Sequence, residues 1–391
     1  MKTATASKRA GGRLREVDGL RALAILAVMT SHAFTPLPLP AVRVVTMFGG
    51  AGVDLFFVIS GFLIGGILMD HREATNYYRV FYARRFWRIV PLYLLILAPT
   101  LAVTAFGWQR FFKGHSLSGQ TGATIWLQLL FLQNIVSAFG WGTAPLYLGP
   151  TWSLAVEEQF YLLMPPLIRN LRGRLLPWIF GGAILVSPAL RGALWWFFGN
   201  KASMACYVLL PCRWDALLMG VLCAYAVRTE AWRRLLTARI ASLRLGWMVL
   251  AAGLLGMMAA KLDYRIGPVM QVAGYTWIAA LFACTLLLAT MHPEGALCRF
   301  LSAPVLKPVA TVSYGLYLLH PPITAVVQEI CWGHASAAEG WEETGVNLLA
   351  MGATGVVAAV SWRFFESRLI QFGHRRGYEA PTESQTSRAE P

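Results

Sequence analysis

Apolar segments of about twenty residues recur along almost the whole chain. Windows of this length fall at 18–35, 49–69, 88–106, 150–168, 175–197, 211–228, 246–260, 269–290, 308–330 and 345–366. A helix of about 20 residues crosses the roughly 30 Å hydrocarbon core of a bilayer. The chain is 57% hydrophobic and 14% charged, well outside the usual soluble balance. We therefore predict an all-α fold, a polytopic transmembrane helical bundle of about ten transmembrane helices.

One further apolar stretch, 125–139, is too short and too polar to count as a span. It is about 15 residues long and carries three amides, Gln128, Gln133 and Asn134. We interpret it as a re-entrant or interfacial segment. Counting it as a span would also place three arginines on the outer side: Arg169, Arg172 and Arg174.

Basic residues lie in short clusters between the apolar segments and produce the net charge of +15. This distribution is typical of the positive-inside bias of membrane proteins and disfavours nucleic acid as a partner. The ten-span arrangement places both termini and the loop 72–88 in the cytoplasm, in a cell inner (cytoplasmic) membrane. It leaves outside Arg43, Arg110, Lys113, Arg191, Lys201, Arg213, Lys261 and Arg265.

This interpretation divides the chain into a basic cytoplasmic tail (1–17), one transmembrane domain (18–368) and a disordered cytoplasmic tail (369–391). The cysteines are scattered, and neither they nor the histidines show metal-ligand spacing, so no metal is expected.

The first span places a cation and an imidazole on one helical face. Arg21 and His32 are eleven residues apart, which brings their side chains onto the same face about 16 Å apart along the axis. A titratable side chain at membrane depth is costly unless it faces a protein interior or a wet cavity, and it suggests a functional site. A histidine paired in a helix interface is the competing interpretation.

Other spans also carry polar residues. Asp54 interrupts the second span, and Glu157 and Glu158 lie about a third of the way into the fourth. One of these two glutamates is expected to meet His32 or an arginine, because two unpaired carboxylates at that depth would be very unfavourable. The sixth span carries Arg213 and Asp215. The ninth carries Tyr317 and His320, where His320 precedes two prolines and is equally compatible with a structural break.

The inner loop before the third span carries three arginines in five residues: Arg84, Arg85 and Arg88. Arginine suits bidentate contacts to phosphate. The same residues would also serve as topological anchors or as ligands for lipid headgroups.

Taken together, these residues resemble the membrane-bound acyltransferase-3 family of bacterial integral-membrane O-acyltransferases. The resemblance covers roughly Arg15 to Arg368. It rests on ordered motifs: Arg21-x10-His32, GVDLFFVISGFLI, FYARRFWRIVPLY, WSLAVEEQFY, CRWDALLMG, SYGLYLLHPP and SWRFFES. It implies a ten-helix domain that uses cytoplasmic acyl-CoA, with His32 and Arg21 essential and Arg85 and Arg88 near the CoA. The extracytoplasmic esterase-like domain of some relatives is absent, so the chain is expected to complete transfer alone or to pass the acyl group to a partner protein.

The predicted reaction moves an acyl group, most simply from acetyl-CoA, to a hydroxyl of a surface glycan or lipid-linked sugar, such as lipopolysaccharide or exopolysaccharide. His32 acts as general base, with Glu158 or Asp54 orienting it, or carries the acyl group covalently. Acceptor contacts are assigned to Trp152, Ser153, Arg213, Asp215, Tyr317 and His320. The rival functions are a transporter that uses the buried charges as an ion or proton path and a structural scaffold.

Overall fold

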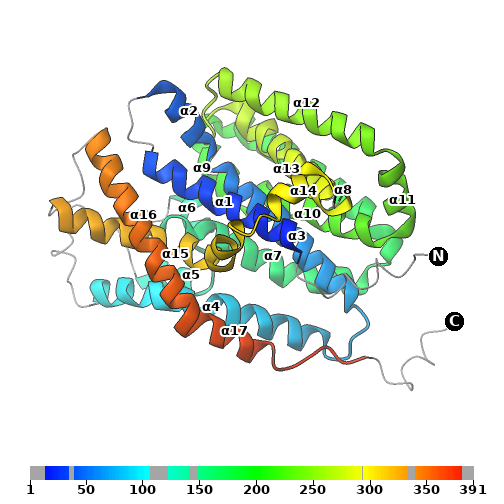
Figure 1. The fold of residues 1–391 in the computed structure, drawn as a ribbon, viewed down its shortest axis with the longest axis horizontal. Coiled ribbons are helices and arrows are strands. Elements are labelled where there is room, and N and C mark those ends of the chain that lie inside the picture. Colours follow the sequence, from blue (N-terminus) through cyan, green and yellow to red (C-terminus); the bar gives the residue numbers. More distant parts are fainter. Residues whose placement is uncertain are drawn as a thin grey trace.

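The computed structural model describes residues 14–34, 39–105, 122–140, 148–292, 294–332 and 340–380. Within these ranges all regular secondary structure is helical (Figure 1). The predicted basic tail up to residue 13, the last residues from 381, and Arg110 and Lys113 lie outside the described part of the chain.

The long helices are α1 (Arg15–Phe34), α3 (Ala51–Asp70), α4 (Tyr77–Ala105), α7 (Thr151–Asn170), α8 (Leu176–Phe198), α10 (Leu210–Arg228), α12 (Ile240–Ala259), α13 (Tyr275–Met291), α15 (Leu306–Trp332) and α16 (Trp341–Ser361). Shorter helices are α2 (Pro40–Phe48), α5 (Gly122–Leu129), α6 (Gln133–Phe139), α9 (Ser203–Val208), α11 (Glu230–Ala238), α14 (Ala296–Leu301) and α17 (Ser367–Gly373). The π-helical turns η6 (Met270–Gly274) and η7 (Trp362–Glu366) lead into α13 and α17, and the 3-10 turns η4 (Gly173–Leu175) and η5 (Gly199–Ala202) flank α8.

Each predicted apolar window coincides with one long helix. In the described part of the chain, seven helical stretches are long and apolar enough to cross a membrane. The three long helices outside that set are α4, α7 and α15, and they carry other residues of the predicted site: Arg84, Arg85, Arg88, Glu157, Glu158 and His320. The chain is a multi-pass membrane protein, and the count of ten spans remains a prediction.

Large apolar side chains cover the outside of the bundle. Helix α12 buries none of its residues, and Trp178, Leu185 and Trp196 of α8 are between 70% and 83% exposed. Exposed apolar area on this scale is unfavourable in water and is what lipid chains cover. These faces are therefore the lipid-facing surface of the protein.

Helix α3 lies inside the bundle and packs tightly against α10 (Figure 1). A Cβ atom at Gly61 would meet the carbonyl oxygen of Leu217, and one at Gly220 would meet the carbonyl oxygen of Val58. Small residues at these two positions are what allow the two backbones to approach. The close contact positions Asp54 of α3 beside the N-terminal half of α10.

The segment predicted to be re-entrant forms two short helices, α5 and α6, instead of one long one. The chain breaks at Phe131, whose φ is 55°. Buried amides hold the break in place, because Gln133 donates to the carbonyl of Thr151 at 2.8 Å and Asn134 donates to that of Val208 at 3.2 Å. The break confirms that this stretch differs from the spanning helices, while its re-entrant placement in the membrane remains a prediction.

Basic residues gather where α3, α7 and α10 end and α4 begins, which we call the basic end. Arg72 donates to the carbonyl of Arg169 at 3.1 Å, and Arg228 pairs with Asp70 at 2.8 Å. Figure 1 shows the turn between α3 and α4 at this end, with the red C-terminal segment passing beside it.

The tail expected to be disordered from residue 369 has a defined course as far as Ala380. Helix α17 packs on α4 through Phe372 and Trp87, whose ring centroids are 4.8 Å apart. Beyond it, Asn76 donates to the carbonyl of Gly377 at 3.1 Å. The expectation failed here because the aromatic contact and the backbone hydrogen bonds involve partners distant in sequence.

Candidate active site

His32 forms a pair with His320, which lies 288 residues away in the sequence. Nδ1 of His32 is 3.0 Å from Nε2 of His320, and the ring centroids are 4.9 Å apart. His32 lies near the end of α1 and is exposed, whereas His320 is buried in α15. Nδ1 of His320 faces the carbonyl oxygens of Tyr317, at 2.8 Å, and Leu316, at 3.2 Å.

These contacts determine the tautomers of two neutral imidazoles. A carbonyl oxygen only accepts, so Nδ1 of His320 carries the hydrogen and its Nε2 is an acceptor. Nδ1 of His32 must then donate to that acceptor. The remaining nitrogen of His32, Nε2, keeps its lone pair, which is the requirement for a general base.

The pair corrects the expected partner of His32. We expected Glu158 or Asp54 to orient the imidazole, yet the structure places His320 against its Nδ1. Glu157, the other candidate, bonds to Ser60 and Tyr161 instead. Helix α7 directs Glu157 toward Ser60 of α3 and Glu158 toward Arg85 of α4. Asp54 instead faces Arg213 of α10.

Two further predicted acceptor residues lie beside this pair. The hydroxyls of Ser153 and Tyr317 are 2.6 Å apart, and Tyr317 donates to the carbonyl of Pro150 at 2.9 Å. The ring centroids of Tyr317 and His320 are 6.0 Å apart. The structure therefore brings Ser153, Tyr317 and His320 together with His32.

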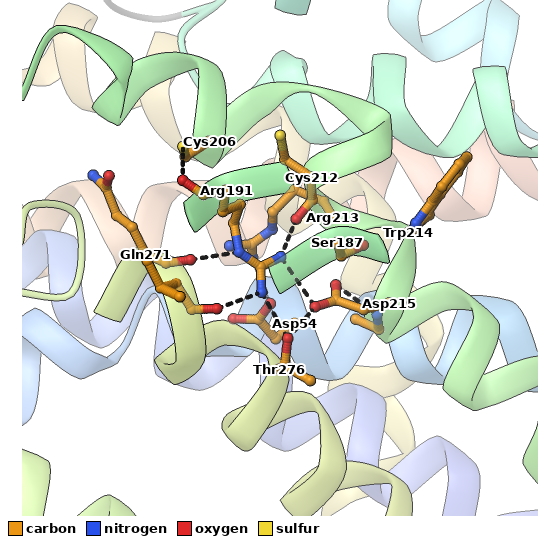
Figure 2. A network of polar contacts seen from close by, with 12 residues as sticks. Asp54, Ser187, Arg191, Cys206, Cys212, Arg213, Trp214, Asp215, Gln271 and Thr276 are labelled. Carbon is orange, nitrogen blue, oxygen red and sulfur yellow. Dashed lines mark hydrogen bonds and ion pairs between the residues drawn. The ribbon is translucent and has the colours of Figure 1, made fainter. Parts of the chain in front are cut away.

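The predicted acceptor residues Arg213 and Asp215 belong instead to a buried ion-pair network, which we define as Asp54, Arg191, Arg213 and Asp215 (Figure 2). Each side chain is at most 1% exposed. Asp54 pairs with Arg213 and accepts a hydrogen bond from Tyr264. The guanidinium of Arg213 lies 4.1 Å from the Tyr275 ring centroid and is also within 6 Å of Phe57, Trp152 and Tyr207. Trp152 thus packs on this network.

Arg191 is the member of the network that the sequence analysis missed, since it was assigned to the outer side. Figure 2 shows its guanidinium between Asp215, Thr276 and backbone carbonyls of α10 and η6. It bonds to Asp215 at 3.0 Å and to Thr276 at 2.6 Å, and donates to the carbonyls of Gln271, Cys212 and Val272. An arginine inside the apolar window 175–197 was the signal available in the sequence.

A second polar group lies toward the basic end. Ser60 donates to Glu157 at 2.7 Å, and Tyr161 donates to the same carboxylate at 3.1 Å. Arg21 and Arg88 are the nearby cations that act on Glu157 electrostatically, and Arg85 acts on Glu158. Helices α1, α4 and α7 therefore meet through charges of opposite sign.

We define the arginine cluster as Arg21, Arg84, Arg85 and Arg88. All four side chains are partly buried. The Nε atoms of Arg84 and Arg85, and Oε1 of Glu158, are buried without a hydrogen-bond partner among the described residues. Partial burial, with added repulsion from Arg84, Arg85 and Arg88, lowers the pKa of His374 at the surface beside them. Positive potential and unused donors together make this cluster a candidate anion site.

The chain is similar in sequence to a protein family and to several curated proteins. The family model Acyl_transf_3, described as an acyltransferase domain, matches residues 14–364. The peptidoglycan O-acetyltransferase OatA of Listeria monocytogenes is 27% identical over 91% of the chain and 56% of its own length. The putative peptidoglycan O-acetyltransferase YrhL of Bacillus subtilis is 30% identical over 92% and 55%. The O-acetyltransferase OatA of Staphylococcus aureus is 26% identical over 92% of the chain and 57% of its own length.

The chain therefore spans a little more than half the length of the curated relatives it matches. No solved structure matches it.

Proposed function

Because this chain belongs to the acyltransferase-3 family, we propose that it is an O-acetyltransferase that moves an acetyl group from acetyl-CoA to a hydroxyl of a cell-wall glycan. The O-acetyltransferase names of its relatives support the reaction type. The donor, the acceptor and the roles of His32, His320 and the arginine cluster are parts of this proposal.

One observation carries the proposal, namely the pair formed by His32 and His320 at 3.0 Å. With Nδ1 of His32 donating to His320, the lone pair on Nε2 of His32 is available for a proton. A base held by a second group is the arrangement used to activate hydroxyl nucleophiles. His320 is thus a positioning residue for His32 in this proposal.

In the direct route, Nε2 of His32 removes the proton from the acceptor hydroxyl, and the oxygen attacks the carbonyl carbon of the thioester. The carbon–sulfur bond then breaks, and the CoA thiolate takes the proton back from the imidazolium. In the alternative route the acetyl group first transfers to His32 and then to the acceptor hydroxyl. Both routes require His32.

The arginine cluster would hold the donor phosphates at the basic end, which we place on the cytoplasmic side. Arg21 and His32 lie on one helix about 16 Å apart along its axis, from eleven steps of about 1.5 Å. A donor bound at the cluster would therefore need to extend its pantetheine arm into the bundle to present the thioester beside His32. Labelling of cysteines placed at Arg172 and Glu342 from the two sides of the membrane would test this orientation.

The acceptor is proposed from the relatives, two of which are named for peptidoglycan. This replaces the earlier expectation of lipopolysaccharide or exopolysaccharide, for which the comparisons offer no support. An acyl-accepting partner protein remains a prediction.

The test measures acetyl transfer from acetyl-CoA to soluble glycan fragments by the full-length protein in lipid nanodiscs. His32→Ala should lower turnover by about 10²–10⁴-fold. His320→Ala should lower it less, and His320→Gln should recover part of that loss, because a Gln oxygen can still accept from Nδ1 of His32.

His292→Ala, a histidine in the loop after α13, is the matched control and should behave as wild type. Near-native turnover of His32→Ala would eliminate both routes. Rapid-quench trapping of an acetylated protein that is lost in His32→Ala would select the covalent route.

A further inference from the structure

The chain beyond α17 crosses the basic end as a strap, which we define as residues 374–380. Asn76 holds its backbone from both sides, since its side chain donates to the carbonyl of Gly377 at 3.1 Å and accepts from the N–H of Glu379 at 3.1 Å. The backbone N–H of Thr75 donates to the carbonyl of Glu379 at 3.2 Å. These bonds fix the position of Tyr378, which lies between the hydrogen-bonded residues Gly377 and Glu379.

The Tyr378 ring is stacked on His71, with ring centroids 3.8 Å apart and an interplanar angle of 10°. The guanidinium of Arg84 lies over the same ring at 5.0 Å from its centroid. Arg84 also donates to the carbonyl of Arg376 at 3.0 Å. The strap thus places a partly buried aromatic ring directly beside the arginine cluster.

Two neighbouring donors at this place are unused. The Nε atoms of Arg84 and Arg85 are buried and have no acceptor among the described residues. The partners that Arg84 does have, a phenol ring and a carbonyl, are neutral. A phosphate forms charge-assisted hydrogen bonds that are roughly twice as strong as neutral ones. The side chains therefore favour an anion next to a planar ring.

We propose that Tyr378 is a donor-binding residue and that the purine ring of the acyl-CoA stacks on it in place of the His71 imidazole. This inference rests on the proposed function, because it places the nucleotide end of the same donor. The imidazole of His71 is partly exposed and makes no hydrogen bond within the described part of the chain, so its displacement costs the stacking contact but no hydrogen bond. A bicyclic purine covers more of the phenol ring than an imidazole does.

The test compares acetyl-CoA with acetyl-pantetheine, which carries the same thioester but no nucleotide. Stacking of one base on an aromatic side chain corresponds to about 5- to 150-fold in affinity. In full-length protein in nanodiscs, Tyr378→Ala should raise the KM for acetyl-CoA about tenfold more than it raises the KM for acetyl-pantetheine. Tyr378→Phe, which keeps the ring, should match wild type with both donors.

Other outcomes would overturn the proposal. An equal change in KM with both donors would mean that Tyr378 only supports the fold, and a lower KM for acetyl-CoA would mean that the strap obstructs the donor. Unchanged KM values in Tyr378→Ala, with a wild type that uses acetyl-CoA, would reject this inference alone. A wild type that neither binds nor uses acetyl-CoA would reject the proposed donor together with it.

Discussion

Two groups of charges inside this bundle are built from the same kinds of side chain, yet they differ in whether their arginines are ion-paired. In the ion-pair network, Arg191 has five partners within the protein, and Arg213 is paired with Asp54, while its Nε and Nη1 atoms are buried among aromatic rings without an acceptor. In the arginine cluster, Arg84 and Arg85 also keep a buried donor each without an acceptor, and neither forms an ion pair with another described residue.

The difference separates a structural role from a binding role. Buried charges are very unfavourable unless paired, so a network in which each arginine has a carboxylate partner fixes the arrangement of the helices around it. A group of arginines without carboxylate partners at the edge of the bundle is instead suited to an anionic ligand. Burial of charge in a membrane span is therefore not by itself a sign of catalysis, as Asp54, Arg213 and Asp215 illustrate.

The largest expected effect tests the network as a structural element. Arg191→Ala leaves Asp215 buried without its cation and removes the hydrogen bonds that Arg191 donates to three carbonyls, so we expect a loss of about 3–5 kcal/mol of stability. Thermal unfolding in detergent, followed by tryptophan fluorescence, measures it. The double variant Arg191→Met, Asp215→Leu should recover only part of this stability, because the hydrogen bonds from Arg191 to the three carbonyls are still lost. Unfolding of Arg191→Ala at the wild-type temperature would contradict the structural role.

The next effect tests the arginine cluster as a ligand site. Arg85→Lys keeps the charge but loses the planar fork, and it should raise KM for acetyl-CoA by about tenfold with unchanged unfolding temperature. Arg79→Lys, an exposed position on the same helix, is the matched control and should leave KM unchanged. Unaltered KM in both Arg85→Lys and Arg88→Lys would move the phosphate site elsewhere.

The smallest effect calibrates both groups against an exposed pair of the same chemistry. Arg228 and Asp70 form an ion pair at 2.8 Å with each side chain 31% exposed. Solvent screens such a pair, so Asp70→Asn should cost only about 0.2–1 kcal/mol, and less at high salt. A loss comparable to that of Arg191→Ala, measured by the same unfolding experiment, would show that burial is not what distinguishes the network.

Much of the fold was predictable because the bilayer imposes a length and a composition on each span. The apolar windows identified every long helix. The motif order also identified the family, since the model match of 14–364 nearly coincides with the predicted range of roughly Arg15 to Arg368. Arg84, Arg85 and Arg88, which the structure places in α4, were predicted to bind phosphate from their local density, and this stays a prediction.

The pairing of polar side chains was not predictable to the same extent. We expected a carboxylate beside His32, but its partner is the imidazole of His320 on a helix 288 residues later. Arg191 was missed because its position near the end of an apolar window suggested the outer surface. The course of residues 374–380 was missed because its backbone bonds to Asn76, which belongs to a distant loop.

By itself the sequence determined the helices, their apolar faces and the family, because hydrophobic length and local motifs act within about twenty residues. The tertiary structure alone decided which buried charges form ion pairs with one another and which do not. Helix rotation and packing set those contacts, and residues on different helices are brought together regardless of their separation along the chain. In this protein, helix packing places His320 against Nδ1 of His32. It also brings Asp54 and Arg213 into the ion-pair network instead of the candidate active site.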